Sequence, residues 1–145
     1  TELDDTQCPT GAFLSVEGSP FDFREMKKIG DGIHCDNAQL KLGGTYDHNF
    51  VINGDGLREA AVLQSKESGI RMTCFTDQPG VQLYVPCYTL HQKGIDGKDY
   101  PPYSAVCLET QHYPNAINIE HFPSVVLKAG ENFRSKTLYH FSVMG

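Results

Sequence analysis

The sequence has no long apolar run: no stretch approaches the roughly 20 residues that a membrane-spanning helix needs. It also has no basic cluster. Twelve Lys and Arg residues stand against eighteen Asp and Glu residues, which gives a formal net charge of -6. Nucleic-acid binding depends on clustered Lys and Arg that neutralise phosphates. We therefore expect neither a membrane nor a nucleic acid among the partners.

The familiar metal, cofactor and nucleophile motifs are missing as well. The sequence has five cysteines, an odd number, which are widely separated and show no CxxC spacing. His112 and His121 do not form a recognisable metal-ligand spacing, and no GxSxG, P-loop or GxGxxG fingerprint occurs. We predict neither a metal nor a cofactor. Scattered cysteines favour a reducing compartment, so a cytoplasmic location is predicted.

The residues present predict one folded all-β domain over residues 1–145. A chain of 145 residues suits one core, and seven Tyr with eight Phe are too many for a disordered chain. Fourteen Gly and eight Pro separate short segments rich in β-branched and aromatic residues. The expected strands are Ala60–Ser65, Ile70–Thr76, Val81–Val85, Ala105–Gln111, Val125–Lys128 and Thr137–Val143.

The segments between the strands are expected to be turns and loops. Ser68-Gly69 fits a tight hairpin turn, and a second turn is expected at residues 53–56. Residues 91–102 hold Gly, Pro and charges, so a long loop is expected there. The best helical candidate, Phe23–Ile29, is at most two turns long.

Polar side chains on one expected strand suggest a site. Successive side chains on a strand point to opposite faces, so Glu109 and Gln111 share a face opposite Leu108. The simpler interpretation is a solvated face. The alternative is a rigid ligand-binding face on which Glu109 is held for proton transfer.

Two further polar segments are open to the same two interpretations. Asp47 and Asn49 project together from a segment that follows Gly43-Gly44, where turn-closing Asp and Asn residues are common. Gln78 precedes Pro79-Gly80, which indicates a turn. Spacing alone does not decide between structural and binding roles for these residues.

Five motifs follow one another along nearly the whole chain. They are Pro9-Thr10-Gly11 with Pro20-Phe21-Asp22-Phe23-Arg24, Tyr46-Asp47-His48-Asn49-Phe50, Thr76-Asp77-Gln78-Pro79-Gly80-Val81-Gln82, Cys107-Leu108-Glu109-Thr110-Gln111 with Pro114, and Phe122-Pro123 with Leu127-Lys128-Ala129-Gly130-Glu131. Together they resemble the C-terminal half of the galactose mutarotase (aldose 1-epimerase) family. Five motifs in the right order make this resemblance specific.

The resemblance implies a fold and a set of site residues. The fold is part of a large antiparallel β-sandwich, the galactose mutarotase-like supersandwich, whose concave face binds a monosaccharide. Glu109 would be the catalytic base, and Asp47 and Gln78 would bind sugar hydroxyls. The general-acid histidine lies in the family's N-terminal half, which nothing here matches, and His48 is no substitute for it. The N-terminal half of the same domain is therefore an expected partner.

The implied activity is that of an aldose 1-epimerase, which interconverts the α and β anomers of a hexose such as galactose or glucose. The chain by itself is then expected to be incomplete and inactive. The main alternative is a carbohydrate-binding module on the same scaffold without turnover. A site for a sugar phosphate would want a basic cluster, which the sequence does not show. An unrelated β structural protein is the remaining alternative.

Overall fold

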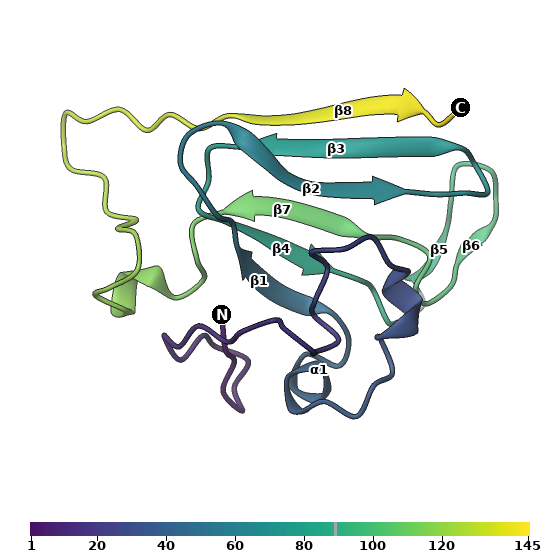
Figure 1. Cartoon of the computed structure of the whole chain (residues 1–145), viewed down its shortest axis with the longest axis horizontal. Helices are drawn as coiled ribbons and strands as arrows, with labels where there is room; N and C mark the ends of the chain where they lie inside the picture. The colour runs from purple at the N-terminus through teal and green to yellow at the C-terminus, as the bar shows by residue number, and fades with distance from the viewer. Residues whose placement is uncertain (89) are drawn as a thin grey trace.

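The computed structural model describes residues 1–88 and 90–145, and its main elements are eight β-strands and one short α-helix (Figure 1). Two 3₁₀ turns, η1 and η2, accompany them. In chain order the elements are η1 (Ile29–Asp31), α1 (Ala38–Gly43), β1 (Asp47–Val51), β2 (Arg58–Gln64), β3 (Ile70–Thr76), β4 (Gly80–Tyr84), β5 (Leu90–Lys93), β6 (Asp99–Tyr100), β7 (Cys107–Gln111), η2 (Ala116–Asn118) and β8 (Thr137–Val143).

The strands form antiparallel sheets, as an all-β chain predicts. One three-stranded sheet has the order β1-β4-β7, a second has the order β2-β3-β8, and β5 pairs with β6. In Figure 1 the strands of the second sheet run along the same general direction as those of the first, and the β5-β6 hairpin lies at one end. Side chains of β8 reach β7: Thr137 contacts Thr110, and the Tyr139 hydroxyl donates to the Leu108 carbonyl at 2.8 Å.

Five of the six expected strands are confirmed with small shifts at their ends, as β2, β3, β4, β7 and β8. Both expected turns are confirmed too. Gly69 has a φ of 71° between β2 and β3, and Gly54 and Gly56 have φ values of 80° and 67° between β1 and β2. These are left-handed conformations that glycine adopts without a steric cost.

Three expectations about local structure are wrong. Val125–Lys128 is not a strand: its valines are 45% and 59% exposed, and no described strand pairs with it. β-Branched residues favour strands chiefly by packing on a neighbouring strand, and here that neighbour is missing from the described residues. The segment expected to be helical at Phe23–Ile29 is irregular up to Lys28, and only Ile29 enters the 3₁₀ turn η1, while Phe23 packs on Tyr46. Within the expected loop at 91–102, part of β5 pairs with β6.

The helix α1 was not predicted from periodicity, because six residues are too few to show it. Its ends carry local signals. The Asn37 side chain accepts hydrogen bonds from the amides of Gln39 and Leu40, which caps the first turn. Gly44, with a φ of 70°, ends the helix in the left-handed region. The cap places Leu40 against the buried Tyr46 just before β1.

The sheet β1-β4-β7 has one apolar and one polar face, which the strand register fixes. On the apolar face His48, Leu83 and Leu108 lie in one row, and Phe50, Val81 and Thr110 in the next. The main core forms on this side from Leu40, Tyr46, Leu83 and Val85, with Phe21, Phe23, Ile29, Ile33, Phe50 and Leu108 packed around it. Covering this face leaves the opposite face of the same sheet for polar residues.

The second sheet is only partly covered. On β8, Leu138 is 48% exposed, Phe141 63% and Val143 81%. Among the described residues β8 pairs with β3 alone, so its other edge has no strand partner. Exposed apolar side chains beside a free edge are typical of a surface that another segment covers. Within residues 1–88 and 90–145 no helix is both long and apolar enough to cross a membrane.

Candidate functional site

The polar face of the β1-β4-β7 sheet is built from three rows of side chains. Residues directly opposite each other on antiparallel strands point to the same face. The register therefore places nine residues on this face, in the rows Asp47-Tyr84-Cys107, Asn49-Gln82-Glu109 and Val51-Gly80-Gln111. Two carboxylates and three amides thus share one face of a rigid sheet.

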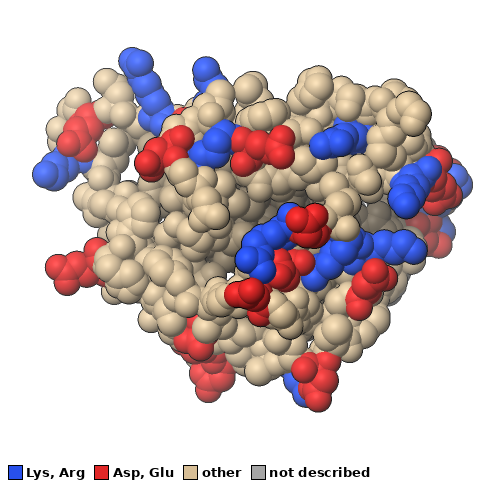
Figure 2. Space-filling view, viewed as in Figure 1, with Lys and Arg blue, Asp and Glu red and all other residues tan. Residues whose placement is uncertain are grey.

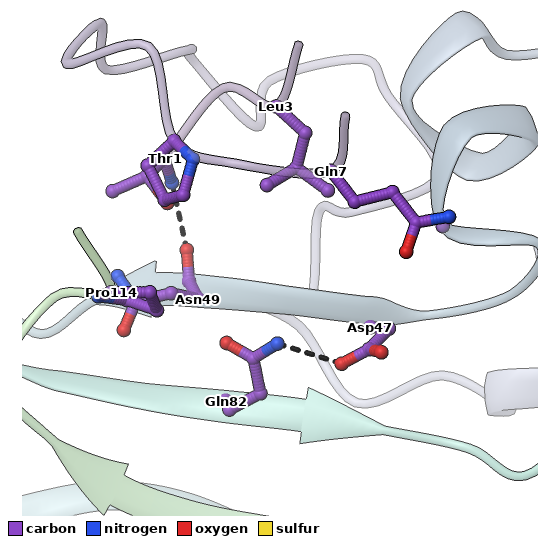
Figure 3. A pocket seen from close by; sticks show the side chains of 9 residues that line it. Thr1, Leu3, Gln7, Asp47, Asn49, Gln82 and Pro114 are labelled. Atoms are coloured by element: carbon purple, nitrogen blue, oxygen red, sulfur yellow. Dashed lines mark hydrogen bonds between the residues drawn. The ribbon is translucent and has the colours of Figure 1, made fainter. Parts of the chain in front are cut away.

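Gln82 connects the first two rows. Its Nε2 donates to the Asp47 Oδ1 at 2.7 Å, and Figure 3 shows the two side chains pointing toward each other. This bond holds one carboxylate oxygen of Asp47 in place and leaves the other available. The pair therefore offers fixed acceptors and donors of the kind that a polyhydroxylated ligand needs.

A small hollow lies beside this pair. It has a volume of about 90 Å³ and is lined by Thr1, Leu3, Gln7, Pro9, Gly43, Asp47, Asn49, Gln82 and Pro114. Figure 3 shows the N-terminal segment over β1, where the Thr1 nitrogen lies 2.7 Å from the Asn49 carbonyl oxygen. Ligand pockets have volumes of roughly 300–1,000 Å³, so the described residues do not enclose one here.

Glu109 lies on the polar face, as predicted, but it is exposed. It stands directly across from Gln82 and two strand spacings, about 10 Å, from Asn49. It does not line the hollow and forms no hydrogen bond or ion pair with the other described residues. The partial burial expected for a catalytic base is therefore not supplied by this part of the chain.

Gln78 does not join Asp47 and Glu109. Only 6% of the residue is exposed, and its amide is bonded at both ends. Its Oε1 accepts from the His112 Nδ1 at 2.8 Å, and its Nε2 donates to the Ser135 Oγ at 2.8 Å. These bonds tie the β3–β4 turn to the ends of β7 and β8. The predicted role of Gln78 in sugar binding stays a prediction, and its contacts are structural.

Gln82 lies on the polar face but was not among the residues expected at the site. The motif Gln78-Pro79-Gly80-Val81-Gln82 contains two glutamines, and the resemblance assigned sugar binding to Gln78. The signal for the second was alternation, because Gln82 lies between Val81 and Leu83, which are 4% and 6% exposed. A polar residue between two buried apolar ones on a strand lies on the opposite face, here that of Asp47 and Glu109.

His48 is a packed structural histidine. It is 4% exposed, its Nδ1 accepts from the Asp47 amide at 3.1 Å, and its Nε2 lies 3.1 Å from the Gln39 carbonyl. These partners fix the neutral form with the proton on Nε2. Burial lowers the pKa of His48 to about 4. A residue with both nitrogens engaged and this pKa is not available as a general acid.

The buried imidazole makes stability depend on pH. An unfolded histidine has a pKa near 6.5, so between about pH 6.5 and 4 the unfolded state binds a proton that the folded state does not. We expect the free energy of unfolding to fall through this window, by about 3 kcal/mol in all. Urea denaturation of the intact gene product from pH 8 to 4 measures this fall. In His48→Gln the fall should be smaller by that amount, whereas His34→Gln, at an exposed site before α1, should behave like the parent. Equal slopes in parent and His48→Gln would contradict the assignment.

The surface around the site carries charges of both signs. In Figure 2 acidic and basic side chains are intermixed over the visible face, with large uncharged areas between them. Fold and site together define an antiparallel β-sandwich protein in which one sheet presents a polar face of carboxylates and amides.

Comparison with known proteins gives the family. The profile described as Aldose 1-epimerase matches residues 1–140, and the chain belongs to this family. It is 39% identical to the galactose mutarotase of Bos taurus over 97% of this chain, and 29% identical to the aldose 1-epimerase of Escherichia coli K12 over 96% of this chain. Among solved structures, a GalM/aldose epimerase homologue from C. elegans superposes with a TM-score of 0.85 at 32% identity over 99% of the chain. These structural neighbours confirm the predicted fold class.

The matches cover nearly all of this chain but less than half of each relative. The chain covers 40% of the length of the Bos taurus protein, 41% of the Escherichia coli protein and 43% of the C. elegans structure. The galactose 1-epimerase structure from Lactobacillus acidophilus NCFM is also matched over only part of its length: the TM-score is 0.82, and 41% of its chain is covered. The described residues thus correspond to less than half of a relative of this family.

Proposed function

We propose that the intact gene product is an aldose 1-epimerase that interconverts the α and β anomers of a hexose such as galactose or glucose. The observation that carries this proposal is the polar face of the β1-β4-β7 sheet, on which Asp47, Gln82 and Glu109 stand together. Family membership and the names of the relatives support it. A neutral sugar is bound by oriented hydrogen-bonding groups more than by net charge, which suits this face.

The reaction requires two proton transfers. One group takes the proton of the C1 hydroxyl while another protonates the ring oxygen, and the hemiacetal opens. After rotation about the C1–C2 bond the ring closes on the other face, and the two groups exchange roles. In this proposal Glu109 is the base, because a carboxylate suits the first task when its surroundings raise its pKa toward working pH. Asp47 and Gln82 hold sugar hydroxyls.

The remaining parts of the site are proposed to come from outside the described residues. A general acid, a second wall for the hollow and partial burial of Glu109 are all needed. The apolar surface and free edge of β8 are where further chain would pack. We propose that the N-terminal half of the same domain supplies these elements, since the chain covers only 40% of its relative's length. Residues 1–145 alone should then be inactive.

A binding module without turnover is the second candidate, and the exposure of Glu109 is the observation that favours it. Such a protein would bind a monosaccharide on the same face through Asp47 and Gln82 and leave the rate of anomer exchange unchanged. The two candidates differ in one measurable quantity, the rate of anomer interconversion.

Polarimetry of freshly dissolved α-D-galactose tests the proposal, together with an intact mass of the gene product. We expect a mass well above 16.1 kDa and a rotation that reaches equilibrium faster than in buffer. Saturable sugar binding without acceleration would favour the binding module. A stable, monomeric native product of 16.1 kDa would contradict the missing-half proposal.

A further inference from the structure

We propose that Gln111 is a positioning residue that orients the Gln82 amide and, through it, the Asp47 carboxylate. This inference rests on the proposed function. Gln111 shares the polar face with Glu109 on β7, but it lies beside Gly80 and off the row of the proposed base. Its side chain is therefore close to the site without standing at its centre.

The amide nitrogen of Gln111 has one hydrogen-bond acceptor on β4 and one on β1. Its Nε2 lies 3.3 Å from the Gln82 Oε1 and 3.5 Å from the Asn49 Oδ1. A primary amide nitrogen has two protons, so one can be donated to each oxygen. Gln111 thereby links the outer strands β7 and β1 across β4.

Gly80 makes this link possible because it leaves a gap in the third row of the polar face. A Cβ at position 80 would lie 2.4 Å from the Asn49 Oδ1 and 3.0 Å from the Tyr113 ring. Any larger residue would force Asn49 aside. Because Gly80 has no side chain, the Asn49 amide can lie beside it, within reach of the Gln111 amide.

The direction of these bonds determines which way round the Gln82 amide is held. Because Gln111 donates to Oε1, the Gln82 amide group turns its Nε2 toward Asp47, to which it donates at 2.7 Å. Without Gln111, the Gln82 Oε1 loses this donor, and Asp47 alone holds the Gln82 amide in this orientation. With the amide reversed, Oε1 would face the Asp47 carboxylate and repel it. Gln111 therefore acts on a sugar ligand only through Gln82 and Asp47.

A double-mutant cycle tests this route. Gln111→Met, Gln82→Met and the double variant are made in the intact gene product, with Gln64→Met, at a partly buried glutamine on β2, as the control. Anomer exchange of galactose is followed at several sugar concentrations, and the unfolding midpoint of each variant is measured. Should Gln111→Met fail to fold, Gln111→Glu replaces it, because a carboxylate has nearly the same size and no proton to donate.

We expect Gln111→Met to raise KM about fivefold, the worth of roughly one hydrogen bond, and to change kcat less than about twofold. In the Gln82→Met background the same change should raise KM by less than about twofold, because the residue through which Gln111 acts is gone. Gln64→Met should match the parent protein.

Additive effects of the two variants would overturn the inference, as would a loss of kcat and unfolding midpoint without a change in KM. If the parent protein binds galactose without turning it over, the cycle is read from Kd with the same expectations. A parent protein that neither binds nor converts the sugar overturns the proposed function itself, and the positioning role falls with it. The failures of the two proposals are thus separate results.

Discussion

Glu109→Gln should lower kcat for anomer exchange by about 10²–10⁴-fold in the intact gene product, the range typical of a lost general base. The amide keeps the size of the carboxylate and its place across from Gln82 on β7, but it cannot take up the proton of the C1 hydroxyl. Because the substitution removes proton transfer and not sugar contacts, KM should change little. Polarimetry or NMR exchange measurements on α-D-galactose give both constants.

The matched control is Glu59→Gln, at an exposed glutamate on the strand β2 away from the polar face. It makes the same change of charge and should leave kcat unaltered. Equal acceleration by the parent protein and Glu109→Gln would remove Glu109 from the mechanism. It would also leave the polar face as a binding surface only.

The two glutamines of the Gln78-Pro79-Gly80-Val81-Gln82 motif should respond to substitution in opposite ways. Gln78→Met leaves the half-buried His112 Nδ1 without its partner, and an unpaired group of this kind costs about 1–3 kcal/mol, whereas the exposed Ser135 keeps its bond to Asp77. The free energy of unfolding should therefore fall by about 1–3 kcal/mol, with KM for galactose preserved. Gln82→Met removes the donor to Asp47 and should raise KM about tenfold with little change in stability.

Chemical denaturation and sugar titration of both variants measure these effects, and each variant is the other's control because the side-chain change is the same. A large rise in KM for Gln78→Met, with stability unchanged, would restore the role that the sequence analysis gave to Gln78. A loss of stability with unchanged KM in Gln82→Met would make Gln82 a structural residue.

The sheet faces could be predicted from the sequence because they depend on alternation alone. Glu109 and Gln111 were expected on one face, and Asp47 and Asn49 on one face, and the strand registers place all four together. Which strands lie side by side could not be predicted from alternation, because pairing of β1 with β4 and of β4 with β7 is set by contacts far apart in the chain. Gln82 was not expected at the site for this reason: only the register places it across from Glu109.

Local propensity failed where tertiary contacts decide the conformation. Val125–Lys128 has the composition of a strand, but no described strand lies beside it. Phe23 lies in a segment of helical appearance and is instead packed in the core on Tyr46. The short helix α1 had only its capping residues Asn37 and Gly44 to indicate it. For Phe23 the neighbour that decides the structure, Tyr46, is distant in the sequence.

The central claim is that the carboxylate on the middle of β7 exchanges a proton with the anomeric oxygen of a sugar lying on the β1-β4-β7 sheet. A crystal structure of the intact gene product with bound galactose tests this directly. The claim predicts a Glu109 carboxylate oxygen about 2.6–3.2 Å from the C1 oxygen of the sugar, with Gln82 and Asp47 bonded to other hydroxyls. A sugar bound elsewhere, or a Glu109 side chain that still faces open solvent in the complex, would contradict it.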